Sequence, residues 1–244
     1  METPSQRLRS KLDLAYPALS AHAERIWSSP SVRELYQAYL IVMHMVVRSA
    51  VPLLQGALDQ ARRRSSSDNV AAGLVSYFDR HICEESGHDT WLLEDLKATG
   101  IDATEPLRRI PSSRVATLVG AQYYWLRHHH PVSLLGHIAV VEGYHPPAGF
   151  ANRLRNLTGY SKEAFRAIER HETLDILHKR DLYELIDSLP LQREHEKLLG
   201  MSALHTVQAG IDVLVEVYEA VASESPDAGV RVNNFNIAAV SNMS

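Results

Sequence analysis

The chain has 244 residues, 45% of them hydrophobic and 22% charged, which is the composition of an ordinary globular protein. Its 25 basic and 29 acidic residues give a formal net charge of −4, so no basic surface for nucleic acid is expected. A single cysteine, Cys83, excludes an intramolecular disulfide framework and favours a reducing, cytoplasmic location. The N-terminal residues lack the apolar core of a signal peptide, and no uncharged apolar run is long enough to predict a membrane span. The unusual feature is a count of 13 histidines.

Apolar residues recur at helical spacing along almost the whole chain. The spacing predicts one helix over 31–61, kinked at Pro52, and a second over 70–98 that ends before Gly100. Further helices are predicted over 113–129, 132–144, 148–157, 161–169, 170–188 and 191–222. Because no stretch alternates with period two, the sequence predicts an all-α fold of about seven or eight helices. We expect one domain over 1–244, with a loose tail after about residue 223.

One histidine motif stands in the predicted helix 170–188. His171, Asp175 and His178 are spaced i, i+4 and i+7, which places them within about 60° of one another on a helix. Two imidazoles and a carboxylate on one face are a typical ligand set for a first-row transition metal. The alternative is a solvated face, because Glu172 and Lys179 beside them are also charged.

The same spacing recurs in the predicted helix 70–98. His81, Glu85 and His88 again follow i, i+4 and i+7, and Glu84 lies about 60° from their stripe. A surface pairing of carboxylates with histidines would explain this stripe equally well. Two such stripes in one helical protein favour a shared metal site, because the core of a bundle is where they can meet.

A third candidate is Glu142, which ends the apolar run 138–141. A carboxylate that faces inward from such a helix must be paired, protonated or bound to metal, whereas at a helix end it can also face solvent. His137 lies five residues earlier and is not expected to share its direction. Three carboxylates and three imidazoles are then candidate ligands: Glu85, His88, Glu142, His171, Asp175 and His178. This mixture suits iron or manganese, with zinc as the general competitor.

Together, the E-E-x-x-H motif, a later glutamate in an apolar helix and H-x3-D-x2-H resemble the haem-oxygenase-like diiron oxidases and oxygenases. This family is all-α and shares its fold with thiaminase II and pyrroloquinoline-quinone synthase. The resemblance implies two Fe²⁺ ions per chain, O2 as co-substrate, and a small-molecule substrate such as an amino acid or fatty acid derivative. It also implies a possible homodimer. The ligands it implies are Glu85, His88, Glu142, His171, Asp175 and His178.

The sixth ligand is open, because the family places its first carboxylate at varying distance before the histidine. Glu85 fits best by spacing, Glu84 is the second choice, and one register would place His81 there instead. Other activities of this fold match less well: thiaminase chemistry needs a cysteine, and only Cys83 is present. Haem oxygenase would need a proximal histidine such as His22 or His44, which would leave six candidate ligands without a role.

Two functions outside this family remain as alternatives. An HD-type metal-dependent phosphohydrolase is suggested by His81 and the doublet His88–Asp89, and a non-catalytic helical binding protein is the third possibility. The triplet 128–130 spans about 200° of a helix, so it is predicted to be a frayed helix end. A further set of aromatic and histidine side chains either lines a cavity or packs in the core: Tyr123, Tyr124, Trp125, Tyr144 and His205.

Overall fold

Helices account for almost all of the chain that the computed structural model describes, residues 2–144 and 147–222. They are α1 (Pro4–Trp27), α2 (Val32–Val47), α3 (Ala50–Arg64), α4 (Asn69–Glu85), α5 (His88–Ala98), α6 (Glu105–Arg108), α7 (Ser113–His128), α8 (Ser133–Val141), α9 (Phe150–Thr158), the 3₁₀ helix η1 (Lys162–Phe165), α10 (Arg166–Ser188) and α11 (Arg193–Ala222). No strand occurs within these residues, so the predicted all-α class is confirmed.

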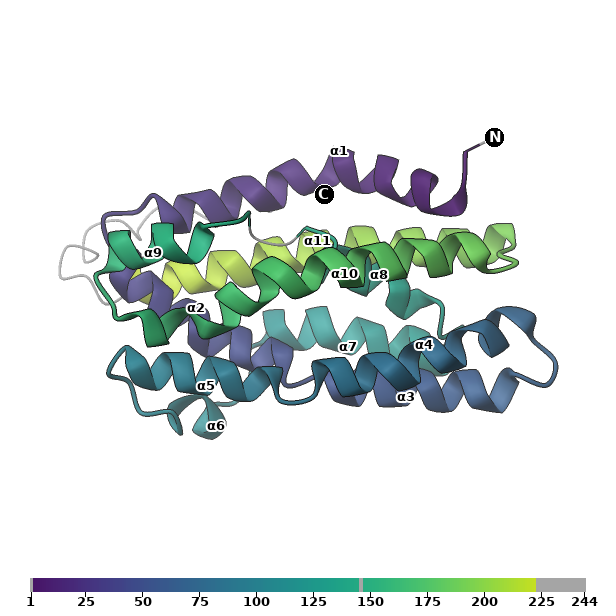
Figure 1. The fold of residues 1–244 in the computed structure, drawn as a ribbon, viewed down its shortest axis with the longest axis horizontal. Coiled ribbons are helices and arrows are strands. Elements are labelled where there is room, and N and C mark those ends of the chain that lie inside the picture. The colour runs from purple at the N-terminus through teal and green to yellow at the C-terminus, as the bar shows by residue number, and fades with distance from the viewer. Residues whose placement is uncertain (1, 145–146, 223–244) are drawn as a thin grey trace, which may run out of the picture.

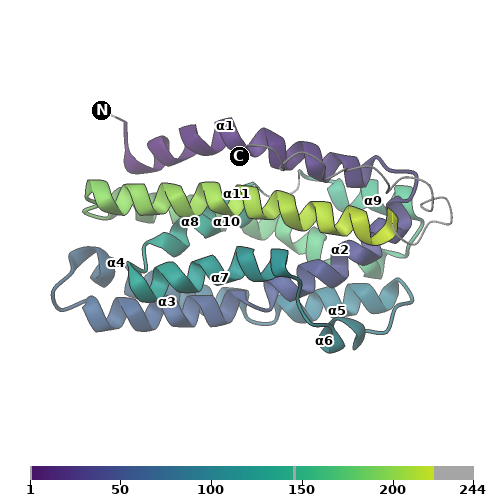
Figure 2. The ribbon, with the colours of Figure 1, turned by 180° about the vertical axis from the view of Figure 1, so that it is seen from behind.

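The helices form an elongated bundle. In Figure 1, α1 runs along one edge and α10 crosses the front, while α2 with α3 and α4 with α5 follow one another along the length of the molecule. Figure 2 shows α11 in front of the opposite face, where it extends over nearly the full length. Helices α1 and α8 pack along α11, and α3 pairs with α4.

Two apolar clusters fill this bundle. One gathers Leu53, Leu74 and Leu134 with their neighbours on α3, α4, α8 and the first half of α11. The other gathers Tyr36, Leu96 and their neighbours on α2, α5, α9 and the second half of α11. Each buries a large apolar area, which is the main favourable term in folding.

The first long helix predicted from the sequence is divided in two. α2 ends at Val47 and α3 begins at Ala50, so the prediction of one kinked helix over 31–61 is wrong. Pro52 explains the position, because it has no N–H to donate to the carbonyl of Arg48 and its ring would clash there. The chain turns at Arg48 and Ser49, and the backbone N–H of Leu53 donates to the carbonyl of Ser49 at 2.9 Å.

The second long helix is also divided, at Gly87. Its φ of +90° is a left-handed conformation that costs glycine little, and it separates α4 from α5. Further along, α10 begins at Arg166 and merges with what the sequence predicts as the end of a separate helix over 161–169. Helix α1 was not predicted from the sequence. Its start is nevertheless marked by a capping box between Thr3 and Gln6 and by Pro4 at the first helical position.

A glycine allows α8 to lie close to α11. A Cβ at Gly136 would stand 2.2 Å from the carbonyl oxygen of Leu199 and 2.9 Å from the backbone nitrogen of Ala203. This close approach fixes the position of α8, which carries His137 and is followed directly by Glu142. By length and composition, the stretches 32–64 and 193–222 could each cross a membrane, but half of each is buried within the bundle, as in core helices of soluble proteins.

Candidate metal centre

The side chains that the sequence singles out converge at one place in the bundle. α4 contributes His81 and Glu85, α5 begins with His88, Glu142 follows α8, and α10 contributes the H-x3-D-x2-H residues. All of these except His178 line one cavity, and His178 contacts Glu142 from beside it. The cavity walls also include Leu53 of the first apolar cluster and Leu92 of the second, so the centre lies where the two clusters meet.

Glu142 contacts two histidines of the cluster. One of its oxygens, Oε1, lies 2.9 Å from Nε2 of His81, and Oε2 lies 3.4 Å from Nδ1 of His178. Burial alone would raise the pKa of Glu142, but the two histidines beside it hold that pKa well below its ordinary value. Donor atoms of these three residues lie within 4.8 Å of one another, close enough to share one metal ion.

The structure distinguishes the two glutamates that the sequence could not. Glu85 lines the cavity, and only 10% of its side chain is exposed; its carboxylate lies 3.1 Å from Nδ1 of His88 and 3.9 Å from Nδ1 of His178. Glu84 also lies near His178, at 3.8 Å from Nε2, but it is 35% exposed, faces Arg80 and His81, and does not line the cavity. The geometry therefore places Glu85, rather than Glu84, among the candidate ligands.

His81 is a member of the cluster that spacing alone left open. Its side chain is buried, and its two ring nitrogens face Glu142 at 2.9 Å and Glu84 at 3.1 Å. Burial lowers the pKa of His81, but the Glu142 carboxylate more than offsets this and raises the pKa to about 9. In this arrangement His81 supports Glu142 by hydrogen bonding.

His88 reaches the cavity from a helix start rather than from the middle of a helix. The predicted stripe of His81, Glu85 and His88 assumed continuous helix, and that assumption is wrong because Gly87 interrupts it. His88 still faces the cavity, where its ring stacks on Trp91 with centroids 4.0 Å apart and meets the ring of His171 at 5.0 Å. Gly87 and the stacking thus set the direction of His88.

His171 has one nitrogen held by the backbone. Nδ1 lies 2.7 Å from the carbonyl oxygen of Ala167, which can only accept, so Nδ1 carries the proton. Nε2 therefore bears the lone pair that a metal requires, an arrangement typical of ligating histidines. Burial lowers the pKa of His171, which favours the neutral form of its ring.

Asp175 is buried, and the charges of His178 and His81 only partly offset the cost of burying its carboxylate. It is 2% exposed, and burial together with the charge of Glu142 raises its pKa to about 8. Its Oδ1 has no hydrogen-bond partner among the described residues, and neither do Nδ1 of His88, Oε2 of Glu142 and Nδ1 of His178. Nδ1 of His88 faces the Glu85 carboxylate at 3.1 Å, and the Glu142 and His178 atoms face each other at 3.4 Å. Buried polar atoms normally have hydrogen-bond partners, so the oxygen of Asp175 that has none points to a ligand at this cluster.

The cavity beside the cluster has a volume of about 200 Å³. Apart from the candidate ligands its walls are mainly aliphatic, and the described residues that line it include no lysine or arginine. The remaining polar groups are supplied by Tyr39, Ser49 and His137. Spacing along the chain does not reveal a cavity, because a side chain that lines a cavity has the same spacing as one that fills the core.

Residues 37–211 match the family described as iron-containing redox enzymes. The chain belongs to this family. The match covers most of the chain and includes every member of the cluster from α4 to α10. It agrees with the resemblance drawn from the motifs, at the level of an iron-containing redox enzyme with a haem-oxygenase-like fold.

Solved structures show the same fold. A domain of unknown function with a haem oxygenase-like fold from Shewanella denitrificans OS217 is 15% identical, covering 89% of this chain and 90% of that one at a TM-score of 0.70. A TenA homolog from Pseudomonas syringae pv. tomato is 12% identical, with 86% and 92% covered and a TM-score of 0.65. A CADD-like protein of unknown function from Nostoc punctiforme is 16% identical, with 91% and 96% covered and a TM-score of 0.63. No curated protein matches the sequence significantly.

Other candidate residues of this family member lie away from the cavity. Cys83 is exposed on α4, and neither it nor Asp89 lines the cavity. The same holds for His22 and His44. The aromatic residues that could have lined it do not: Tyr123, Tyr124, Trp125 and Tyr144, together with His205.

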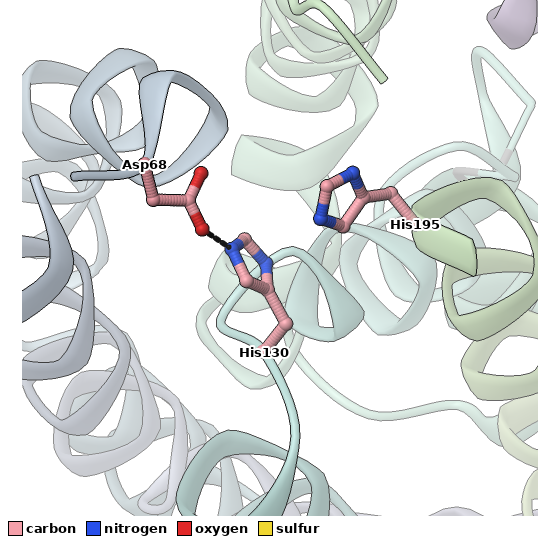
Figure 3. Close-up of side chains that lie close together, drawn as sticks. All are labelled: Asp68, His130 and His195. Atoms are coloured by element: carbon pink, nitrogen blue, oxygen red, sulfur yellow. Dashed lines mark hydrogen bonds and ion pairs between the residues drawn. The ribbon is translucent and has the colours of Figure 1, made fainter. Parts of the chain in front are cut away.

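A second group of potential ligands lies at one end of the bundle, where Asp68, His130 and His195 face one another (Figure 3). Nε2 of His130 donates to Oδ2 of Asp68 at 2.9 Å, because Nδ1 already accepts from the backbone N–H of Val132. Nδ1 of His195 accepts from the backbone N–H of Gln192 in the same way. In both rings Nε2 carries the proton and so has no lone pair for a metal. The group therefore connects segments of the chain through hydrogen bonds and ring contact, and it is not arranged to bind a metal. The prediction that 128–130 frays is wrong for His130, which is buried.

Proposed function

We propose that this protein is a non-haem diiron, O2-dependent oxidase or oxygenase that acts on a small, largely apolar molecule. The observation that carries the proposal is the convergence of buried imidazole and carboxylate groups from four segments of the chain on one cavity, where the Asp175 carboxylate has an oxygen without a hydrogen-bond partner. They supply both nitrogen and carboxylate oxygen, which iron binds well, and the family is one of iron-containing redox enzymes.

Six side chains would hold the two ions, three carboxylates and three imidazoles: Glu85, His88, Glu142, His171, Asp175 and His178. Bound Fe²⁺ would supply the electrons that reduce O2. The chain itself orients the ligands: the Ala167 carbonyl fixes the tautomer of His171, and His81 holds one oxygen of Glu142. Asp175, whose pKa is about 8, would lose its proton when a cation binds beside it.

The walls of the cavity favour a substrate with an apolar body. Leu53, Leu54 and Ile138 line the cavity together with the candidate ligands and give it an apolar wall. A free amino acid carries two charges, and the described lining offers no lysine or arginine for its carboxylate. Of the two substrate classes that the resemblance implies, a fatty acid derivative therefore fits better, with its carboxylate toward the metals.

The phosphohydrolase alternative has less support. It requires Asp89 as a ligand next to His88, and Asp89 does not line the cavity. It would also leave Asp175 and His178 partly without a role.

Iron loading tests the proposed function. Anaerobic Fe²⁺ titration followed by removal of unbound metal is expected to leave about two iron atoms per chain, and the loaded protein is expected to consume O2. Glu142→Gln removes the charge with almost no change in shape. Iron content and O2 consumption should therefore both fall, while the helical circular dichroism stays unchanged. Glu184→Gln is the matched control, since Glu184 lies on α10 with its side chain 72% exposed. Wild-type protein that retains no iron, or a Glu142→Gln variant that matches the wild type, would refute the proposal.

A further inference from the structure

His137 has no part in the proposed metal centre, although it is buried in the same region. It lies in the middle of α8, is 8% exposed, and lines the cavity beside Leu134 and Ile138. Its ring reaches across to α11, where Nδ1 lies 3.1 Å from the hydroxyl oxygen of Thr206. A buried imidazole in an otherwise aliphatic wall needs an explanation, because burying a polar ring costs free energy unless its atoms are paired.

Hydrogen bonds around Thr206 determine which ring nitrogen carries the proton. The Thr206 hydroxyl has one hydrogen and donates it to the backbone carbonyl of Ser202 at 2.8 Å. Its oxygen also lies 3.4 Å from the amide nitrogen of Gln122, whose own oxygen accepts from the Ser202 hydroxyl at 3.0 Å. Toward His137 the Thr206 oxygen can therefore only accept, so Nδ1 of His137 is the donor.

The other nitrogen, Nε2, is consequently an acceptor. Burial lowers the pKa of His137 to about 4, so the ring is neutral near pH 7 and Nε2 carries a lone pair. Nδ1 is the ring nitrogen that faces Thr206, and His137 lines the cavity, so Nε2 is the ring nitrogen available to a ligand there. The cavity thus offers a neutral imidazole acceptor away from the metal ligands, and its other polar groups outside the cluster are the hydroxyls of Tyr39 and Ser49.

We propose that the ligand of this cavity carries an uncharged hydrogen-bond donor, a hydroxyl or an N–H group, on its apolar body, and that Nε2 of His137 accepts this hydrogen bond. His137 is then a specificity-determining residue. Calling the ligand the substrate rests on the proposed function, but binding itself does not depend on iron. A buried acceptor of this kind discriminates strongly, because an otherwise identical ligand without the donor leaves Nε2 unpaired.

Isomeric probes test this directly. n-Octanol and heptyl methyl ether have the same atoms and nearly the same shape, but only the alcohol donates a hydrogen bond. Isothermal titration of the full-length protein without added iron should show that it binds the alcohol about two- to tenfold more tightly, the usual value of one neutral hydrogen bond. Comparing n-hexanol and n-decanol with their own methyl ether isomers covers shorter and longer chains.

Two variants link the preference to His137. His137→Phe keeps a ring of similar size without an acceptor, so the alcohol and the ether should bind equally. His137→Gln should keep the preference, because its amide N–H can donate to Thr206 and leave the amide oxygen toward the cavity. In ¹⁵N-labelled wild-type protein, the Nε2 resonance of His137 should shift when n-octanol is added and should not shift with the ether.

Equal binding of alcohol and ether by the wild type would overturn the proposal, as would a preference that survives in His137→Phe. Failure of every probe pair to bind would overturn it too. The proposed function has a separate outcome, because iron content and O2 consumption are measured without these probes. A protein that binds iron but shows no donor preference would retain the diiron function and lose only the role of His137.

Discussion

At the scale of single residues, the backbone and hydroxyl groups around each histidine determine what its ring can do. A carbonyl holds the proton on Nδ1 of His171 and leaves Nε2 able to bind a metal, and a threonine leaves Nε2 of His137 as an acceptor. Backbone N–H groups do the opposite for His130 and His195, since they occupy Nδ1 and leave the proton on Nε2. Four histidine rings thus have different roles because the ring proton is on Nδ1 in two of them and on Nε2 in the other two.

The neutral state of His137 predicts a pH dependence of stability. Its pKa is about 4 in the folded protein against 6.5 for an unperturbed histidine, so unfolding takes up a proton between these values. The free energy of unfolding should therefore fall as the pH falls from 6.5 to 4, by up to about 3 kcal/mol from this residue. Urea unfolding of the metal-free protein, followed by circular dichroism across this range, measures the effect.

His137→Phe is the comparison for this prediction, because it removes the titrating ring and leaves the other acidic and basic groups in place. Its free energy of unfolding should decline less steeply than that of the wild type over the same pH range. Parallel curves for the two proteins would show that His137 does not stay neutral on folding.

At the scale of secondary structure, two helix breaks shape the metal centre. The break between α2 and α3 follows from Pro52, and the break between α4 and α5 follows from Gly87. The second of these places His88 at the first residue of α5, next to Glu85 at the last residue of α4. The ligand pair therefore depends on a backbone conformation that glycine adopts readily and alanine does not.

Gly87→Ala should weaken both stability and iron binding. The left-handed φ of +90° costs alanine about 1–2 kcal/mol, although a Cβ there meets no atom within 4 Å. Gly100→Ala is the matched control, with a φ of +94° and equally open space, but at the end of α5 away from the cluster. Both variants should lose similar stability in thermal unfolding, whereas only Gly87→Ala should retain less iron. Equal iron content in the two variants would argue against a role of the break in placing His88.

At the scale of the whole molecule, the two apolar clusters need to be held in register for a cavity to remain between them. Asp68 is one of the residues that tie distant segments together. Its Oδ1 accepts from the backbone N–H groups of Val70 and Ala71 at the start of α4, and its Oδ2 accepts from His130 between α7 and α8 (Figure 3). His195, at the start of α11, lies against the ring of His130 with centroids 4.7 Å apart.

Asp68→Ala should destabilise the protein by about 2–3 kcal/mol, since it removes a helix cap and a hydrogen bond between distant segments. Asp102→Ala is the control, because Asp102 bonds only within its own exposed turn, to Thr104 and Arg108, and should cost less than about 1 kcal/mol. Hydrogen exchange should also rise at the first amides of both α4 and α8 in Asp68→Ala. Faster exchange at α4 alone would mean that the hydrogen bond between Asp68 and His130 does not connect the two helices.

The sequence by itself determined the helical class and the residues of the candidate site, because helical periodicity and ligand spacing are local properties of the chain. H-x3-D-x2-H keeps its geometry on the unbroken α10, so His171, Asp175 and His178 could be placed on one face in advance. Spacing did not decide between Glu84 and Glu85, nor did it reveal the division at Gly87, because a glycine inside a helical pattern is compatible with either outcome.

Only the tertiary structure decided what surrounds these residues. The pairing of Glu142 with His81 and His178, the cavity between two apolar clusters, and the acceptor nitrogen of His137 all join segments far apart in the chain. Contacts of this kind arise from how helices pack, which for α8 and α11 depends on the missing side chain of Gly136. Periodicity shows which face of a helix is buried, but not which neighbour it meets, and the chemistry of this site depends on those neighbours.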